Sequence, residues 1–348
     1  MTKELKIGNV YIGNGNKIAI QSMTTADTAS VEATVEQIKR LENAGCDIVR
    51  ASVYNMDAAK AFKSIKENIS IPLVADVHFD HRLAIAAVEN GADKLRINPG
   101  NITDVGAVKM LADCAKSYNV PIRIGVNGGS LSTEVRKRFG ENSAEALVES
   151  AMENVIILED VGFYDICISV KSSNVRKMIN AYELLSEKCD YPLHLGVTEA
   201  GTADIGIVKN AIGIGNLLLK GIGDTMRVSL TTDPVEEVYA AQNILRSIGM
   251  FNEGVEIISC PMCARTRIPL ERIVKEVKEA TRDIKKPIKA AVMGCVVNGP
   301  GEAKDADIGL AGGGGKGEKA VVFKGGQMLA SGELEVMKNL LISELHKM

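Results

Sequence analysis

Tryptophan is absent from this chain of 348 residues, aromatic residues make up only 4% of it, and proline occurs only nine times. No apolar run approaches the roughly 18 residues that a membrane-spanning helix needs. The formal net charge is only −3, so no surface for coating a nucleic acid is expected. The first residues, Met1–Leu5, lack the apolar stretch of a secretory signal. These absences predict a cytoplasmic protein that binds neither a membrane nor a nucleic acid.

The seven cysteines are an odd number in a chain of intracellular character, which disfavours a disulfide framework and leaves metal or redox roles open. The 33 glycines, set against so few prolines and aromatics, indicate many tight turns between strands and helices rather than disorder.

A short β-branched run followed by a helical pattern recurs from residue 17 to about residue 248. The runs predicted to be strands are Lys17–Thr25, Asp47–Val53, Pro72–Asp80, Lys94–Gly100, Pro121–Gly129, Asp165–Ser173, Pro192–Gly201 and Asn216–Leu230. Eight such β–α units predict an α/β fold, a closed parallel TIM (βα)8 barrel, over residues 1–250. Thr2–Asn16 is expected to form a hairpin over the bottom of this barrel. In residues 251–348 the β–α repeat ends, and the pattern there predicts a small α+β domain.

Polar residues in these strands share one parity. The pairs are Arg50 and Ser52, Asp76 and His78, Arg96 and Asn98, Arg123 and Asn127, and Ser169 and Lys171. Strand side chains alternate between the barrel interior and the helix layer, and the opposite parity is mostly small or aliphatic. The polar set is therefore expected to point inward near the carboxyl ends of the strands, where such barrels carry their active sites.

Positive charge dominates this predicted mouth. Its cations are Arg50, Arg96, Arg123 and Lys171, with Arg227 as a further member. Asp76 and Glu199 cannot neutralise all of them, and buried cations without partners are costly. An anion rich in phosphate oxygens is the favoured counter-charge, because planar guanidinium groups suit such oxygens. Internal salt bridges with carboxylates from neighbouring loops are the alternative.

Two residues of this region carry weaker signals. Glu199 follows a strand end, where a carboxyl group either exchanges a proton with a substrate or caps a helix. His78 is consistent with a binding role and equally with a structural one.

Cysteines mark a second site in the C-terminal domain. Cys260 and Cys263 are separated by two residues, and Cys295 precedes a Gly-Pro-Gly turn that ends at Glu302. Thiolates bind zinc or the iron of iron–sulfur clusters, and three of them fall one short of a closed four-cysteine site. Glu302 is the nearest fourth ligand, and this mixed set favours a reactive [4Fe–4S] centre. A zinc site or a redox-active dithiol is the alternative.

Four segments together resemble the bacterial 4-hydroxy-3-methylbut-2-enyl diphosphate synthases, iron–sulfur enzymes of the methylerythritol phosphate route to isoprenoids. These segments are Ser259–Thr266, Met293–Ala303, His194–Gly201 and Gly221–Leu230. The resemblance covers nearly the whole chain. It implies an oxidoreductase that opens 2-C-methyl-D-erythritol 2,4-cyclodiphosphate reductively to 4-hydroxy-3-methylbut-2-enyl diphosphate and water, with electrons from flavodoxin or ferredoxin.

The resemblance also implies site residues. The [4Fe–4S] ligands of the family correspond to Cys260, Cys263, Cys295 and Glu302, and its barrel acid corresponds to Glu199. Its diphosphate-binding residues correspond to Arg96, Arg123, Lys171 and Arg227, with Asn127 and Ser229 as polar contacts. The mouth adds Arg50, Asp76, His78 and Asn98 to the predicted substrate-binding set.

A homodimer is expected as well. The connection Gly249–Glu253 reaches less than ~20 Å, and the last barrel helix ends at the barrel bottom, away from the mouth. The cluster domain of one subunit is therefore expected to cap the barrel of the other, as the family is organised. Two other functions compete: a zinc-stapled aldolase or pterin-type transferase, which would be colourless, and an iron–sulfur electron carrier, which would need no anion pocket.

Overall fold

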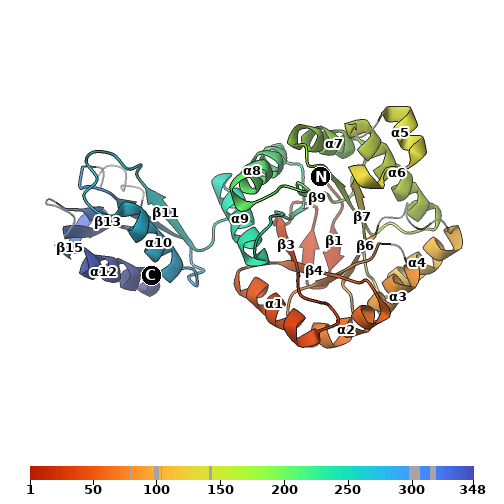
Figure 1. The fold of residues 1–348 in the computed structure, drawn as a ribbon, viewed down its shortest axis with the longest axis horizontal. Coiled ribbons are helices and arrows are strands. Elements are labelled where there is room, and N and C mark those ends of the chain that lie inside the picture. Colours follow the sequence, from red (N-terminus) through yellow and green to blue (C-terminus); the bar gives the residue numbers. More distant parts are fainter. Residues whose placement is uncertain (79, 98–101, 103, 141–142, 298–305, 314–318) are drawn as a thin grey trace. The chain divides into compact units, whose positions relative to one another are not determined.

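A computed structural model describes the chain except residues 79, 98–101, 103, 141–142, 298–305 and 314–318 (Figure 1). The chain divides into two compact units, Met1–Met250 and Phe251–Met348.

The first unit is a parallel barrel surrounded by helices (Figure 1). Its strands are β3 (Ala19–Met23), β4 (Ile48–Ser52), β5 (Leu73–Asp76), β6 (Lys94–Ile97), β7 (Ile122–Asn127), β8 (Ile166–Lys171), β9 (His194–Leu195) and β10 (Thr225–Met226). They pair in the order β8-β7-β6-β5-β4-β3-β10-β9, all in parallel. A parallel bridge between Ile168 and Leu193 brings β8 next to the chain entering β9 and nearly closes the ring. The predicted TIM barrel is confirmed.

Helices cover the outside of this barrel. They are α1 (Val31–Asn43), α2 (Met56–Lys66), α3 (His81–Glu89), α4 (Val105–Ser117), α5 (Thr133–Phe139), α6 (Ala144–Asp160), α7 (Val175–Lys188), α8 (Ala203–Leu219) and α9 (Pro234–Ser247). Several begin at a side chain that accepts a hydrogen bond from a backbone N–H two or three residues on, as Asn55, Asp80, Asp104, Asn174 and Asp233 do. These caps fix the loops that follow the strands, which form the rim of the mouth.

Two predicted strands differ most from the structure. Only His194–Leu195 of the predicted Pro192–Gly201 pairs as a strand, and the second one includes part of a helix. Asn216–Leu230 was expected to be a strand throughout, but Asn216–Leu219 is the last turn of α8, and only Thr225–Met226 pairs as β10. The apolar residues Leu217 and Leu218 are buried because they lie on the inner face of a helix. The turn to β10 passes through Gly221 and Gly223, whose φ angles of 73° and 119° favour glycine.

The N-terminal residues close the barrel bottom, as expected. Strands β1 (Leu5–Ile7) and β2 (Val10–Ile12) form an antiparallel hairpin. Its buried side chains Leu5, Ile7 and Ile12 pack against residues at the beginnings of barrel strands, namely Ala19, Ile48, Val74 and Cys167. This apolar cluster leaves the carboxyl ends of the strands as the open face of the barrel.

The second unit is a five-stranded sheet with two helices. Its strands are β11 (Val255–Ser259), β12 (Ile288–Met293), β13 (Ile308–Gly312), β14 (Lys319–Lys324) and β15 (Gln327–Glu333), paired in that order, and its helices are α10 (Leu270–Ala280) and α12 (Leu334–Lys347). Strands β11, β12 and β13 are parallel, and β14 pairs antiparallel with both β13 and β15. The apolar faces of both helices pack on the sheet around Val292, Leu310 and Val322.

Among the described residues, no helix is long and apolar enough to cross a membrane.

Candidate active site

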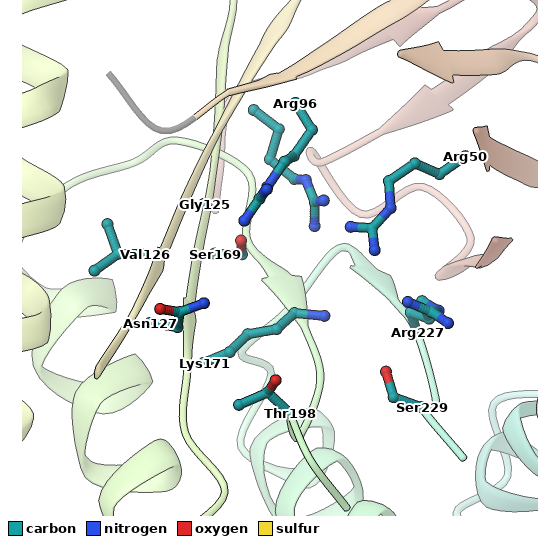
Figure 2. A pocket seen from close by; sticks show the side chains of 11 residues that line it. Arg50, Arg96, Gly125, Val126, Asn127, Ser169, Lys171, Thr198, Arg227 and Ser229 are labelled. Carbon is teal, nitrogen blue, oxygen red and sulfur yellow. The ribbon is translucent and has the colours of Figure 1, made fainter. Parts of the chain in front are cut away.

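A pocket opens where the barrel strands end and holds about 440 Å³ of empty space, part of it open to solvent (Figure 2). Its lining is mostly basic and polar: Arg50, Arg96, Arg123, Gly125, Val126, Asn127, Ser169, Lys171, Thr198, Arg227 and Ser229. Asn127 and Lys171 are the last residues of β7 and β8, so the pocket lies at the carboxyl end of the barrel. Active sites of βα barrels are built at this end.

Most of the predicted binding residues come together in this pocket. Arg50, Arg96, Arg123, Asn127, Lys171, Arg227 and Ser229 all line it. Figure 2 shows the charged ends of Arg50, Arg96, Lys171 and Arg227 turned toward one common space. Strand parity brings them together, since Arg96 pairs with Arg123, and Asn127 with Lys171, in neighbouring strands.

The other predicted residues lie around this group. Asp76 is buried, and its carboxylate is 3.1 Å from Nη1 of Arg96 and 3.6 Å from Nε of Arg50. His78 is about half exposed, with Nε2 3.7 Å from Asp76 and both ring nitrogens within 3.4 Å of Arg96 Nη1. Asn98 lies outside the described residues.

Glu199 directly follows Thr198, which lines the pocket, but Glu199 is not itself among the lining residues. The side chain is exposed, and the backbone φ of +51° is in the left-handed region, which is uncommon for a residue other than glycine. Backbone strain of this kind clusters at functional sites. The helix-capping interpretation of Glu199 is wrong, because the N-cap of α8 is Thr202.

Two carboxylates neutralise part of the positive charge. Asp76 forms ion pairs with Arg50 and Arg96. Glu237 of α9 accepts hydrogen bonds from Nε and Nη2 of Arg227, each at 3.2 Å. Burial raises the pKa of Asp76, but the charges of Arg50 and Arg96 outweigh it and hold this pKa below its ordinary value. Sequence reasoning missed Glu237, which comes from a helix and not from a strand.

Arg123 and Lys171 are left without a carboxylate within 4 Å among the residues that the structure describes. Arg123 is only 1% exposed, and its buried Nε has no hydrogen-bond partner in the same part of the chain. Burial, together with the charges of Arg123 and Arg50, lowers the pKa of Lys171 far below its ordinary value. Unpaired buried cations are costly, so this side of the mouth is built for a negatively charged ligand.

Two glycines make room for these cations, and sequence reasoning missed both. A Cβ on Gly125 would lie 2.6 Å from Nε of Arg96, and a Cβ on Gly196 would lie 2.6 Å from Nζ of Lys171. Gly125 has the inward parity of Arg123 and Asn127 on β7, and a glycine at such a position was the signal that could have revealed it. The absence of these side chains lets two long basic side chains cross the barrel interior.

A Gly196→Ala variant is therefore expected to bind the anionic substrate about tenfold more weakly, as measured by the substrate requirement. The new methyl group would meet the backbone oxygen of Arg227 at 2.7 Å as well as Lys171, so it cannot be accommodated by a side-chain movement alone. Gly215→Ala is the matched control, since the nearest atom to its Cβ is Ile244 Cγ2 at 4.0 Å. An unchanged substrate requirement in Gly196→Ala would show that Lys171 does not need this space.

A further cation, Lys94, is fully buried in the barrel interior and was not singled out from the sequence. Its Nζ lies 3.5 Å from Oε1 of Gln21, whose own Nε2 has no partner among the described residues. Burial, aided by the charges of Arg123 and Arg50, lowers the pKa of Lys94 to about 7.

Lys94→Met is expected to stabilise the barrel, by roughly 2–4 kcal/mol at pH 6. The folded state binds the Lys94 proton only below about pH 7, whereas the unfolded chain holds it up to about 10.5. The cost of burying Lys94 is therefore fully present below pH 7 and disappears as the pH rises to 10.5. Denaturant unfolding should show a larger gain at pH 6 than at pH 9.5, and a gain independent of pH would contradict this origin.

The cysteines of the second unit lie at the ends of adjacent strands. Cys260 follows β11 and Cys295 follows β12, and Sγ of Cys260 accepts a hydrogen bond from the backbone N–H of Gly294 at 3.2 Å. Cys295 is buried and Cys263 is exposed. The backbone N–H of Arg265, together with the charge of that residue, lowers the pKa of Cys263 and favours its thiolate.

In the described ranges, no three His, Cys, Asp or Glu side chains are arranged to hold a metal ion. The predicted fourth ligand, Glu302, lies outside the described residues. Cys260 and Cys295 on neighbouring strand ends, with Cys263 in an exposed and thiolate-favouring loop, nevertheless fit the soft donor set that iron–sulfur clusters and zinc require.

Comparisons with known proteins cover both units. The family model described as the GcpE TIM-barrel domain matches residues 2–242, and the GcpE protein C-terminal domain matches residues 256–347. A protein from Caldanaerobacter subterraneus subsp. tengcongensis, named 4-hydroxy-3-methylbut-2-en-1-yl diphosphate synthase (flavodoxin), is 57% identical over 100% of this chain and 97% of its own. One of the same name from Clostridium perfringens is 55% identical over 99% and 97%.

Among solved structures, a dihydropteroate synthase from Yersinia pestis is similar with a TM-score of 0.51 and 11% identity, covering 72% of this chain and all of that one. At this identity the likeness shows the barrel fold alone.

Proposed function

The chain belongs to the GcpE family, and from this premise we propose how its two sites divide the work of one reaction. The reaction is the reductive ring opening and dehydroxylation of 2-C-methyl-D-erythritol 2,4-cyclodiphosphate to 4-hydroxy-3-methylbut-2-enyl diphosphate, a step of isoprenoid precursor biosynthesis. The chain is thus an oxidoreductase.

The barrel mouth is the proposed substrate site, and the observation that supports it is its uncompensated positive charge. Five cations line one pocket, and two of them, Arg123 and Lys171, lack a carboxylate in the described part of the chain. A cyclic diphosphate supplies the missing negative charge through oxygens that suit guanidinium and ammonium donors.

Each remaining residue of the mouth has a proposed part. Arg96, Arg123, Lys171 and Arg227 bind the diphosphate, and Asn127 and Ser229 add neutral hydrogen bonds. Asp76 holds Arg50 and Arg96 in place, with His78 beside them. Glu199, which follows the pocket-lining Thr198, is the proposed proton donor or acceptor for the substrate. Asn98 is proposed as a further substrate-binding residue.

We propose that Cys260, Cys263, Cys295 and Glu302 hold one [4Fe–4S] cluster. What supports this is the thiolate donor set, with Cys260 and Cys295 at adjacent strand ends, in the unit that matches the GcpE C-terminal domain. When bound, such a cluster supplies the electrons for cleaving the substrate's C–O bond. Zinc is the alternative metal, and the purified protein distinguishes the two, because a zinc–thiolate site is colourless and an iron–sulfur protein is brown.

The proposed electron donor is flavodoxin, which the relatives' names contain, with ferredoxin as the alternative. The proposed assembly is a homodimer in which the cluster domain of one subunit caps the barrel of the other. The proposed location is the cytoplasm.

The activity is tested on protein purified without oxygen, with iron and sulfide analysis and with reduced flavodoxin as electron donor. Conversion of the cyclic diphosphate to the linear diphosphate is the expected result. A brown, iron-loaded protein that leaves the cyclic diphosphate intact would overturn the proposed reaction.

The anion pocket is tested by Arg123→Met and Lys171→Met. Each is expected to raise the substrate requirement by about 10- to 150-fold, which corresponds to the ~1.5–3 kcal/mol of a charge-assisted contact, and to leave the visible spectrum intact. Lys188→Met is the matched control, since Lys188 is exposed at the last residue of α7, at the end of the helix away from the mouth. Unchanged binding in both pocket variants would show that these cations are structural.

A further inference from the structure

His194 lies under the pocket at the start of β9 and is fully buried. Its Nδ1 is 3.4 Å from Oγ1 of Thr225, the residue that pairs with it on β10. That hydroxyl already donates to the backbone oxygen of Ala19 at 2.9 Å, so it receives the proton of His194 Nδ1 rather than giving one. The Nδ1–H tautomer is thereby fixed.

The other ring nitrogen faces a pocket cation. Nε2 of His194 is 3.4 Å from Nζ of Lys171, and in the Nδ1–H tautomer Nε2 is an acceptor. Nζ of Lys171 therefore donates one hydrogen bond to His194 and keeps its other protons for the pocket. The missing side chain of Gly196, the residue directly after β9, leaves the space in which Nζ lies.

The backbone around this pair is fixed by one hydroxyl. Oη of Tyr182, a buried residue of α7, donates to the backbone oxygen of His194 at 2.5 Å and accepts from the backbone N–H of Val170 at 3.2 Å. Val170 immediately precedes Lys171 on β8. The Tyr182 hydroxyl thus fixes the distance between the backbone of His194 and the backbone next to Lys171.

We propose that His194 is a positioning residue for the substrate: as a neutral Nδ1–H imidazole it accepts from Lys171 and aims that ammonium group at the phosphate oxygens. The inference rests on the proposed binding of an anion by Lys171. It assigns a role to a residue that touches no substrate.

The surroundings keep the imidazole neutral. Burial, followed by the charges of Arg123, Lys171 and Lys94, lowers the pKa of His194 far below its ordinary value. The charges that act on the pair are those of Arg50 on β4, Lys94 and Arg96 on β6, Arg123 on β7 and Arg227 after β10, and the titratable hydroxyl of Tyr182 on α7 contacts the backbone of His194. Asp76 on β5 and Cys167 on β8 lie next to these cations. Because cations dominate this set, Nε2 stays an acceptor between about pH 5.5 and 8, and the contact persists over that range.

Two substitutions separate the two ring nitrogens. In His194→Gln, the side-chain oxygen of glutamine can take the place of Nε2 as an acceptor. The asparagine side chain of His194→Asn is shorter and reaches only the position of Nδ1. In the holoenzyme, His194→Asn is expected to raise KM for the cyclic diphosphate about tenfold, with a smaller fall in kcat, and His194→Gln to raise KM less than threefold. Equal effects of the two variants, or a better rescue by Asn, would overturn the proposal.

A second measurement does not depend on these variants folding. In the full chain labelled with 15N-histidine, His194 is expected to show a protonated Nδ1 and an unprotonated Nε2 that does not titrate between pH 5.5 and 8. Lys171→Met is expected to shift the Nε2 resonance. An Nε2–H tautomer, titration within this range or an unshifted Nε2 would overturn the contact. If wild-type holoenzyme neither binds nor converts the cyclic diphosphate, the proposed function fails, and the nitrogen spectrum still decides the His194–Lys171 contact.

Discussion

A Cys295→Ala variant purified without oxygen is expected to contain almost no iron and to be inactive. Cys295 is buried just after β12, and the backbone N–H of the residue before it, Gly294, donates to Sγ of Cys260. Removing it leaves two thiolates, Cys260 and the exposed Cys263, which are too few to retain a cluster. Iron and sulfide analysis and the visible spectrum measure the loss.

Cys114→Ala is the matched control, because Cys114 is a half-buried free cysteine of α4 in the barrel unit. It is expected to keep the iron content of the wild type. Glu302→Ala is expected to reduce turnover more than iron content, because the three thiolates remain. Full iron content in Cys295→Ala would refute the ligand assignment, and the loss of iron in Cys114→Ala would point to general instability.

Mixing two inactive variants is expected to restore activity. Glu199→Gln removes the proposed acid of the barrel, and Cys260→Ala removes a proposed cluster ligand. If each site combines the barrel of one subunit with the cluster domain of the other, a mixed dimer contains one intact site and one doubly damaged site. After complete subunit exchange half of the dimers are mixed, so activity should reach about a quarter of the wild-type level.

The control for this experiment is a pair of variants in the same unit. The mixture of Glu199→Gln with Lys171→Met should show only the average of the activities of the two separate variants. In their mixed dimer, each of the two sites still contains one damaged barrel. No recovery with Glu199→Gln and Cys260→Ala, under conditions where labelled subunits are shown to exchange, would overturn the shared site. A monomer in solution would contradict the dimer directly.

Strand parity predicted much of the mouth because inward and outward positions alternate along any strand and can be counted in the sequence. Arg96, Arg123 and Lys171 were found in this way, and they line one pocket. Glu237 could not be found by this rule, since its approach to Arg227 depends on how α9 packs on the barrel. Glu237 accepts two hydrogen bonds from Arg227 and neutralises that cation.

Other parts of the site depend on space or on distant partners. Gly196 matters through the volume that it leaves empty, and a sequence does not show which neighbour uses that volume. His194 was noted only as the first residue of a segment, because its partners Thr225 and Lys171 are 31 and 23 residues away in the chain. Asn216–Leu230 was misassigned because the apolar end of α8 and the short β10 adjoin in the sequence.

The N-terminal hairpin determines when this barrel can be completed during synthesis. The hydroxyl of Thr2 donates to Asp224 at 2.6 Å, across 222 residues of chain, and the backbone N–H of Lys3 donates to Asp190. Thr2 and Lys3, among the first residues to leave the ribosome, can therefore form these hydrogen bonds only after nearly the whole first unit has been synthesised. Leu5, Ile7 and Ile12 pack against residues from Ala19 to Cys167, so nascent chains that end before β8 leave part of this apolar cluster uncovered and are expected to be chaperone clients.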